Sequence, residues 1–177
     1  MIKNKKELKY YIKCDLKQAG RKGHFMYIGS EIERYLFYLR KNEYFTHKSL
    51  LNGIYKINSF YYRYKQHKLG IKLGFDIPIN VVKQGLRIDH WGFLAISGNA
   101  RIGKNCHIYG DVTIGVKNNK DQRGPIIGDN VTIGAGARII GPVKIASGSI
   151  IGANCVVTKD IIKENSVCVG IPAKVIN

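Results

Sequence analysis

The chain has 177 residues, enough for one domain with a sizeable core and a smaller region beside it. It contains no run of about 18 apolar residues and no signal-like apolar stretch at its N-terminus, so we expect no membrane span and a cytoplasmic protein. The net charge of +17 is concentrated in residues 1–75, which carry 17 Lys and Arg against 5 Asp and Glu. The four cysteines form no CxxC pair and no cluster with histidine, so we expect no metal site.

Residues 1–72 are predicted to form a small helical region. Apolar residues at helical spacing indicate a first helix over residues 5–19, ended by Gly20 and Gly23. A capping box of Ser30 and Glu33 begins a second helix, which we expect to end near Asn42. A third helix is predicted over residues 47–69, with Gly70 as its C-terminal cap.

Basic charge and aromatic residues are interleaved throughout this helical region. Ten of the eleven tyrosines precede residue 76. The composition fits a region that packs its aromatics and solvates its lysines, and it also fits contact with nucleic acid, an anionic membrane surface or an acidic small molecule.

A six-residue repeat occupies residues 96–162. The repeated aliphatics are Ile96, Ile102, Ile108, Ile114, Ile127, Ile133, Ile139, Ile145, Ile151 and Val157. A small or β-branched residue precedes nearly every one by two positions: Ala100, Cys106, Val112, Val131, Ala137, Val143, Ser149 and Cys155. A six-residue period predicts a parallel β-helix, with both columns pointing inward and glycines at its corners.

Residues 73–177 are therefore predicted to form the β-helix, with an irregular first coil over about 76–95. The polar insert 116–125 interrupts the repeat and must project as a loop, which is a frequent location for functional residues. Residues 163–177 are expected to close the β-helix.

His90 is the histidine that stands out, because it lies in Arg87-Ile88-Asp89-His90 at the entrance to the regular coils. A coil of about eighteen residues could bring Asp76 back near it. A carboxylate on one ring nitrogen would fix the tautomer, and the imidazole could then take a proton at neutral pH. A structural role for His90 is the alternative. We expect His107 to be exposed to solvent.

The repeat, the Asp89-His90 pair, the loop ending in Arg123 and the closing Gly170-Ile171-Pro172-Ala173-Lys174 together resemble the serine acetyltransferase-like group of hexapeptide-repeat acyltransferases. The similarity covers roughly residues 74–177. It implies a left-handed β-helix, a homotrimer with active sites between subunits, and acetyl-CoA as the acetyl donor, with no metal.

The resemblance also implies roles for individual residues. His90 would be the general base, oriented by Asp76, and Asp89 and Arg123 would contact the acceptor. Coenzyme A would lie along the later coils, near Gly134, Ala135, Gly152, Ala153, Lys159 and Lys174. The lysines could equally be solvated surface residues.

The acceptor is less closely defined. Serine acetyltransferases carry a second loop histidine where this chain has Gly124, and their helical region is longer. The short Tyr- and Lys-rich region looks more like that of enzymes that acetylate surface polysaccharides. We therefore expect a sugar hydroxyl as acceptor, with L-serine as the alternative and peripheral contact with the inner, anionic face of the membrane.

Two hypotheses from other classes remain. A non-catalytic β-helix scaffold would release no thiol from acetyl-CoA. Binding of nucleic acid by the basic region would depend steeply on salt, and we expect no such partner.

Overall fold

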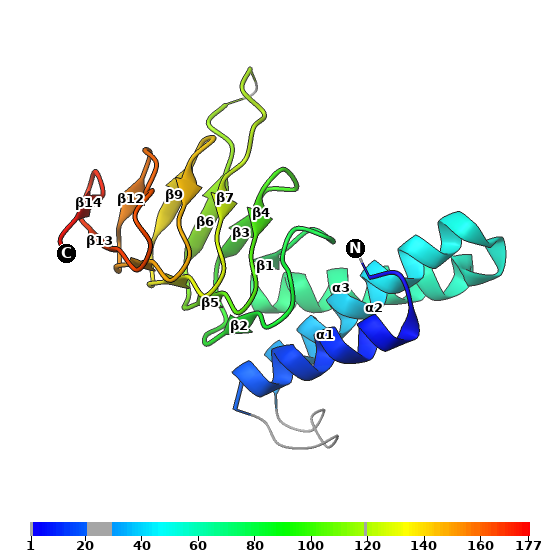
Figure 1. The fold of residues 1–177 in the computed structure, drawn as a ribbon. Helices are drawn as coiled ribbons and strands as arrows, with labels where there is room; N and C mark the ends of the chain where they lie inside the picture. The colour runs from blue at the N-terminus through cyan, green and yellow to red at the C-terminus, as the bar shows by residue number, and fades with distance from the viewer. Residues whose placement is uncertain (1, 21–29, 119) are drawn as a thin grey trace.

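The structure is a computed structural model that describes residues 2–20, 30–118 and 120–177. Within these ranges, three α-helices and a short 3-10 helix come first, and fourteen short strands follow (Figure 1). The helices are α1 (Lys5–Gln18), α2 (Glu31–Leu51), η1 (Gly53–Tyr55) and α3 (Lys56–Leu73). They lie at the end of the β-helix where its first coil begins.

The helix starts follow side-chain caps. The Asn4 carboxamide accepts the Glu7 amide proton at 2.9 Å at the start of α1, and the Ser30 hydroxyl accepts that of Glu33 at 3.5 Å, as predicted. The predicted first helix is confirmed, because α1 ends at Gln18 and Gly20 has a φ of 71°. Gly23, which was also predicted to end it, lies outside the described residues.

The predicted boundary between the second and third helices is wrong. α2 continues through Asn42 to Leu51, because the Asn42 side chain is buried and its amide donates to the Gln66 carboxamide at 2.7 Å. The break comes at Asn52, whose extended backbone and side chain begin η1. The predicted cap at Gly70 is also wrong: Gly70 is buried inside α3, and Gly74, with a φ of 78°, ends the helix.

The strands form three sheets that wind into a left-handed parallel β-helix. Their bounds are β1 (Phe75–Asp76), β2 (Arg87–Ile88), β3 (Leu94–Ile96), β4 (Arg101–Ile102), β5 (His107–Ile108), β6 (Val112–Gly115), β7 (Ile126–Ile127), β8 (Thr132–Ile133), β9 (Arg138–Ile140), β10 (Lys144–Ile145), β11 (Ile150–Ile151), β12 (Val156–Val157), β13 (Val167–Val169) and β14 (Lys174–Val175). The strand order is β1-β3-β6-β9-β12 in the five-stranded sheet, β10-β7-β4 in the three-stranded sheet and β14-β13-β11-β8-β5-β2 in the six-stranded sheet. Among the strands in the described part of the chain, every pair is parallel except β13 with β14.

Both predicted columns point into the core. The ten repeated aliphatics are at most 3% exposed, and the eight smaller residues between them are at most 4% exposed. Cys106 and Cys155 lie in the smaller column as buried free thiols, and burial raises the pKa of the Cys106 thiol to about 12. The six-residue pattern therefore places successive strands in turn on the three sheets that form the faces of the β-helix, a three-sided prism.

The helices and the first coil share one core. Tyr35, Leu36 and Leu39 of α2 belong to the same buried cluster as the β-helix columns. Beside them the fully buried Arg40 guanidinium binds the Asp15 carboxylate of α1 at 2.8 Å. The network ties α1 and α2 to the start of the β-helix.

Candidate active site

The candidate site lies along one edge of the β-helix, where turns join the six-stranded sheet to the five-stranded sheet. We call these stacked turns, residues 89–93, 109–111, 134–137 and 152–155, the His90 edge. The Gly136 amide donates to the Gly110 carbonyl at 3.0 Å, and the Asn154 amide donates to the Ala135 carbonyl at 2.8 Å. Residues far apart in the sequence are thereby stacked along one continuous edge of the β-helix.

His90 lies exposed at the first turn of this edge. Gly110 lies against it in the next turn, since a Cβ on Gly110 would be 3.5 Å from the His90 Cβ. The imidazole therefore stands at the open surface, within reach of a ligand that lies along the edge.

Asp76, the predicted partner of His90, lies at the start of the first coil. It lies on β1 opposite Ala95 of β3, with its side chain exposed. It also lines a groove of about 960 Å³ between α3 and the first coil. No hydrogen bond joins Asp76 to His90 in the described part of the chain, so the proposed dyad stays a prediction.

Asp89 is held by an arginine side chain and a histidine side chain. Its Oδ1 accepts from Arg87 Nε at 2.7 Å, and its Oδ2 lies 2.7 Å from His107 Nε2. The pairing of Arg87 with His107 across β2 and β5 brings these groups together. Burial raises the pKa of the Asp89 carboxyl, but the hydrogen bonds with Arg87 and His107 lower it by more. The pKa of Asp89 therefore lies below its ordinary value. Asp89 therefore presents an ionised carboxylate.

The expectation that His107 is exposed to solvent is wrong. Its side chain is 22% exposed, is paired with Asp89, and stacks on the Tyr109 ring with centroids 4.5 Å apart. The contact could have been found only from the pairing of Arg87 with His107 in the next coil. These two residues are twenty positions apart, because this coil is irregular and longer than the eighteen residues of three repeats. Eighteen residues would have paired Arg87 with Asn105 instead.

Gly134 and Gly152, which were predicted to contact coenzyme A, use their backbone amides to join neighbouring coils. The Gly134 and Gly152 amides already donate to the Ile151 and Cys168 carbonyls at 2.7 and 2.8 Å. A Cβ on Gly134 would lie 2.7 Å from the Ala153 nitrogen, which leaves no room for a side chain. Their exposed neighbours, Ala135 and Ala153, lie on the outside of the same turns.

The two predicted lysines lie elsewhere on the prism. Lys159 follows β12, on the edge that joins the five-stranded to the three-stranded sheet, which we call the loop edge. Lys174 is opposite Val169 in the antiparallel pair of β14 and β13 at the far end. Neither lies among the stacked turns of the His90 edge.

Arg123 also lies on the loop edge. The loop 116–125 connects β6 to β7 and projects at the top of Figure 1, whereas β2 and β5 lie at the bottom. Arg123 Nε and Nη2 each bind the Asp121 carboxylate at 2.9 Å, and these bonds lower the pKa of Asp121 to about 2. Within one chain, Arg123 and His90 are therefore on different edges.

Gly124 follows Arg123 in the loop, at the position where the resemblance to serine acetyltransferases predicts a histidine. A Cβ there would lie 2.5 Å from the Asn99 backbone, so the path of this loop requires glycine.

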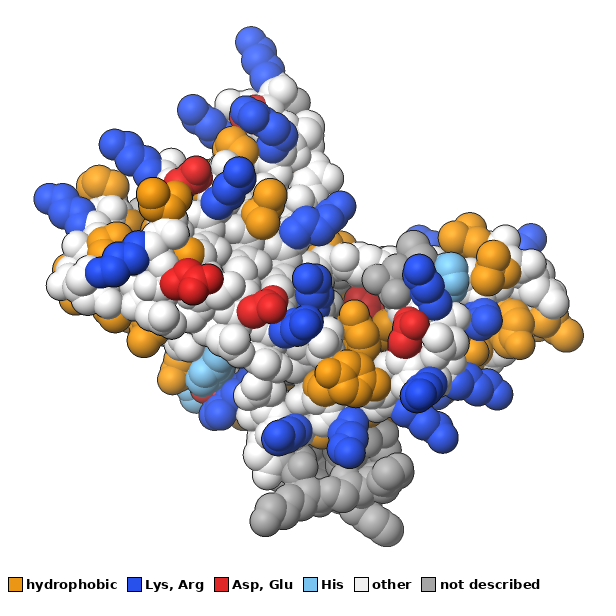
Figure 2. All heavy atoms as spheres, viewed as in Figure 1, with side chains coloured by type: hydrophobic (Ala, Val, Ile, Leu, Met, Phe, Trp, Pro, Cys, Tyr) orange, Lys and Arg blue, Asp and Glu red, His pale blue; other side chains and the backbone are white. Residues whose placement is uncertain are grey.

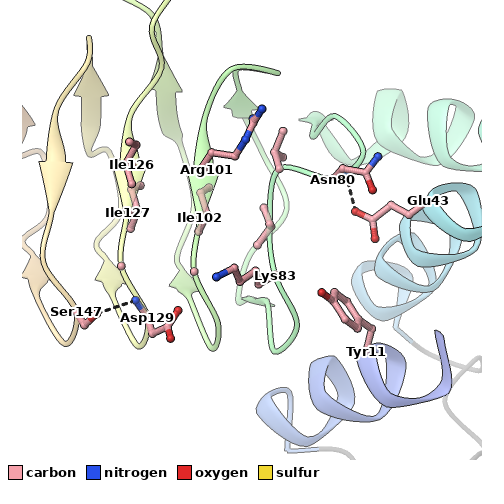
Figure 3. A pocket seen from close by; sticks show the side chains of 14 residues that line it. Tyr11, Glu43, Asn80, Lys83, Arg101, Ile102, Ile126, Ile127, Asp129 and Ser147 are labelled. Carbon is pink, nitrogen blue, oxygen red and sulfur yellow. Dashed lines mark hydrogen bonds between the residues drawn. The ribbon is translucent and has the colours of Figure 1, made fainter. Parts of the chain in front are cut away.

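A separate cavity of about 450 Å³ lies between the helices and the three-stranded sheet (Figure 3). Arg101 and Ile126 face it from the sheet, and Tyr11 and Glu43 face it from the helices. One Glu43 oxygen already accepts from the Asn80 amide at 2.8 Å. The predicted catalytic residues are absent from its lining, so this cavity is distinct from the His90 edge. The described residues also contain no group of three or more His, Cys, Asp or Glu arranged to hold a metal ion.

Comparison with known proteins identifies relatives of the repeat and of the fold. Residues 124–159 match the family described as "Bacterial transferase hexapeptide (six repeats)". A serine acetyltransferase of Mycobacterium tuberculosis is 42% identical over 108 residues, which are 60% of this chain and 47% of that protein. The chain thus spans about half the length of the curated relatives it matches.

Solved structures extend the likeness to the helical region. The Neisseria gonorrhoeae serine acetyltransferase matches with a TM-score of 0.76 and 26% identity, over 98% of this chain and 68% of that one. Soybean serine acetyltransferase complexed with serine matches with a TM-score of 0.76 and 25% identity, over 96% and 69% of the two chains. The chain therefore has the fold of the matched part of these serine acetyltransferases, its own helices lie within the match, and it carries a hexapeptide transferase repeat.

Proposed function

We propose that this chain is an acetyl-CoA-dependent O-acetyltransferase whose acceptor is L-serine. The observation that carries the proposal is the Asp89-His90 pair at the head of a stacked edge, on the fold of serine acetyltransferases. The relatives favour L-serine, which was the alternative in the sequence analysis. They give no support to the expected sugar acceptor or to a likeness with polysaccharide-acetylating enzymes.

His90 is the proposed general base. Its exposed imidazole would take the proton from the serine hydroxyl as the oxygen attacks the thioester carbonyl carbon. The new C–O bond forms, the C–S bond breaks, and the proton passes to the departing thiolate to give free coenzyme A. Asp76 is the proposed orienting carboxylate.

Asp89 is the proposed partner of the serine ammonium group. Each carboxylate oxygen has a second acceptor site besides the one that Arg87 or His107 occupies. The lowered pKa keeps Asp89 anionic at neutral pH, so that it can bind a cation. Arg87 and His107 would fix the orientation of the carboxylate before the acceptor arrives.

A homotrimer would complete this site. His90 and Arg123 lie on different edges of one chain, so a rotation about a three-fold axis can set the loop edge of one subunit against the His90 edge of the next. Arg123 would then reach the acceptor from the neighbour. Lys159 and Lys174 are candidates for the phosphates of coenzyme A, whose chain would pass Ala135 and Ala153.

Release of free thiol from acetyl-CoA, with and without L-serine, tests the activity. We expect serine-dependent release by the unmodified chain and a loss of at least about a hundredfold in His90→Ala. Release with a sugar instead of L-serine would overturn the acceptor assignment, and no release with any acceptor would favour a non-catalytic scaffold.

Mixed oligomers test the shared site. His90→Ala and Arg123→Ala are each expected to be weakly active alone. Random mixing should restore activity at roughly one quarter of the interfaces, where an intact His90 faces an intact Arg123. If mixing restores nothing while the two variants exchange subunits, both residues act within the same chain.

A further inference from the structure

The far end of the helical hairpin formed by α2, η1 and α3 is covered with apolar side chains. Within eleven residues, five large side chains are each 67% to 81% exposed: Leu50, Leu51, Ile54, Ile57 and Phe60. We call this group the hairpin tip. Figure 2 shows hydrophobic and basic side chains together on the lobe that the helices form beside the β-helix.

The hairpin tip is not part of the core. α3 packs against α2 through another face, where Gln66 and Leu73 are buried. Ile57, Phe60 and Tyr64 follow helical spacing on α3 and are at least half exposed, and Phe60 and Tyr64 also line the groove beside the first coil. An apolar group of this size at the end of an otherwise polar lobe indicates a surface that meets a partner.

The charge of the same segment identifies the kind of partner. Between Glu43 and Asp76 the chain carries six Lys and Arg and no Asp or Glu. Lys56 lies inside the tip, and Arg63 lies one turn after Phe60 and is also exposed. A second copy of this segment would bring like charges together, which disfavours self-association. The partner must therefore be both apolar and anionic.

An anionic membrane surface has both properties. Aliphatic and aromatic side chains enter the boundary between headgroups and acyl chains, and lysines and arginines bind the headgroups around them. Exposed tyrosines such as Tyr61 and Tyr64 suit the same interface, with an apolar ring and a polar tip. Nucleic acid would engage the basic residues but would leave the aliphatic side chains in water.

We propose that the hairpin tip docks this protein onto anionic membrane surfaces by inserting Leu50, Leu51, Ile54, Ile57 and Phe60 below the headgroups. The contact is peripheral, because no helix in the described ranges has the length and apolar composition of a membrane span. The tip lies at the opposite end of the molecule from β14, so the coils of the β-helix extend away from it (Figure 1).

Co-sedimentation of the full chain with lipid vesicles tests the proposal. We expect binding to phosphatidylcholine vesicles that contain phosphatidylglycerol, weak binding to phosphatidylcholine alone, and weaker binding as salt rises. The double variant Ile54→Ser/Ile57→Ser should lose at least about tenfold in partition coefficient. Ile162→Ser is the matched control, since Ile162 is 83% exposed on the β-helix, and it should bind like the unmodified chain.

Two charge-reversal variants complete the test. Lys56→Glu should lower the partition coefficient by roughly fivefold or more, whereas Lys104→Glu, exposed on the β-helix, should leave it nearly unchanged. Equal losses for both lysines would show attraction by net charge alone and would overturn docking by the tip.

Other outcomes overturn the proposal in different ways. Unchanged vesicle binding by Ile54→Ser/Ile57→Ser, with a smaller oligomer in sedimentation velocity, would show that a second copy covers the tip. Binding of duplex DNA that the same variant retains, without vesicle binding, would assign the basic residues to nucleic acid. Acetyl transfer is measured separately without lipid, so failure of the proposed function leaves this test unaffected.

Discussion

Replacing Arg40 with methionine tests whether the helices and the β-helix form one folding unit. The guanidinium is fully buried and donates to the carboxylates of Asp15 and Glu43, and to the carbonyls of Val82 at 2.9 Å and Lys83 at 2.8 Å. Burial lowers the pKa of Arg40, but the two carboxylates raise it above its ordinary value, so the group stays charged. One side chain therefore joins α1, α2 and the first coil.

Methionine would keep much of the volume but would leave two buried carboxylates without their cation. Removing one partner of a buried ion pair costs about 3–5 kcal/mol. Asp15 still accepts from the Gly85 and Leu86 amides at 2.7 and 2.9 Å, which places the expected loss near the lower end, about 3 kcal/mol. Arg63→Met, at an exposed position on α3, should change the free energy of unfolding by less than about 0.5 kcal/mol.

Urea unfolding followed by circular dichroism measures both variants. We expect a lower midpoint for Arg40→Met with an unchanged slope, which indicates the same surface exposed on unfolding. A loss under about 1 kcal/mol, or a first transition confined to the helices, would show that the network does not join the two parts.

Two further predictions concern the His90 edge. Gly134→Ala should lower the free energy of unfolding by about 1–3 kcal/mol, because its Cβ would lie 2.7 Å from a backbone nitrogen of the next coil. Gly53→Ala should be nearly neutral in the same urea assay, because its Cβ would make only an ordinary contact, 3.9 Å from the Lys56 side chain. Asp89 has a lowered pKa, so its contribution to stability is complete above about pH 4 and is lost as the pH falls through the lowered value. Asp89→Asn should therefore flatten that part of the acid unfolding curve, and an unchanged curve would contradict the pairing with His107.

The regular coils could be predicted from the sequence because one physical rule repeats there. Each six-residue unit must bury one aliphatic, so Ile133 or Ile151 can be placed inside without knowledge of any other contact. The polar residues between Val116 and Pro125 supply no inward column and could be placed outside by the same rule, whereas Pro125 itself is buried.

The network around Arg40 could not be predicted in this way. Arginine is rarely fully buried, so the pattern of α2 gives no reason to turn Arg40 inward unless its partners on α1 and the first coil are known. The pairing of Asp89 with His107 was missed for a related reason, since it depends on the length of an irregular coil. The extension of α2 depends likewise on the buried contact of Asn42 with Gln66.

The central claim is that His90 is the base that activates an acceptor hydroxyl for attack on acetyl-CoA. The most direct measurement is thiol release with L-serine by His90→Ala across a range of pH, beside the unmodified chain. We predict a loss of at least about a hundredfold in kcat at neutral pH, with a smaller deficit at high pH, where hydroxide replaces the base. Full turnover by His90→Ala, with the same pH profile as the unmodified chain, would contradict the account.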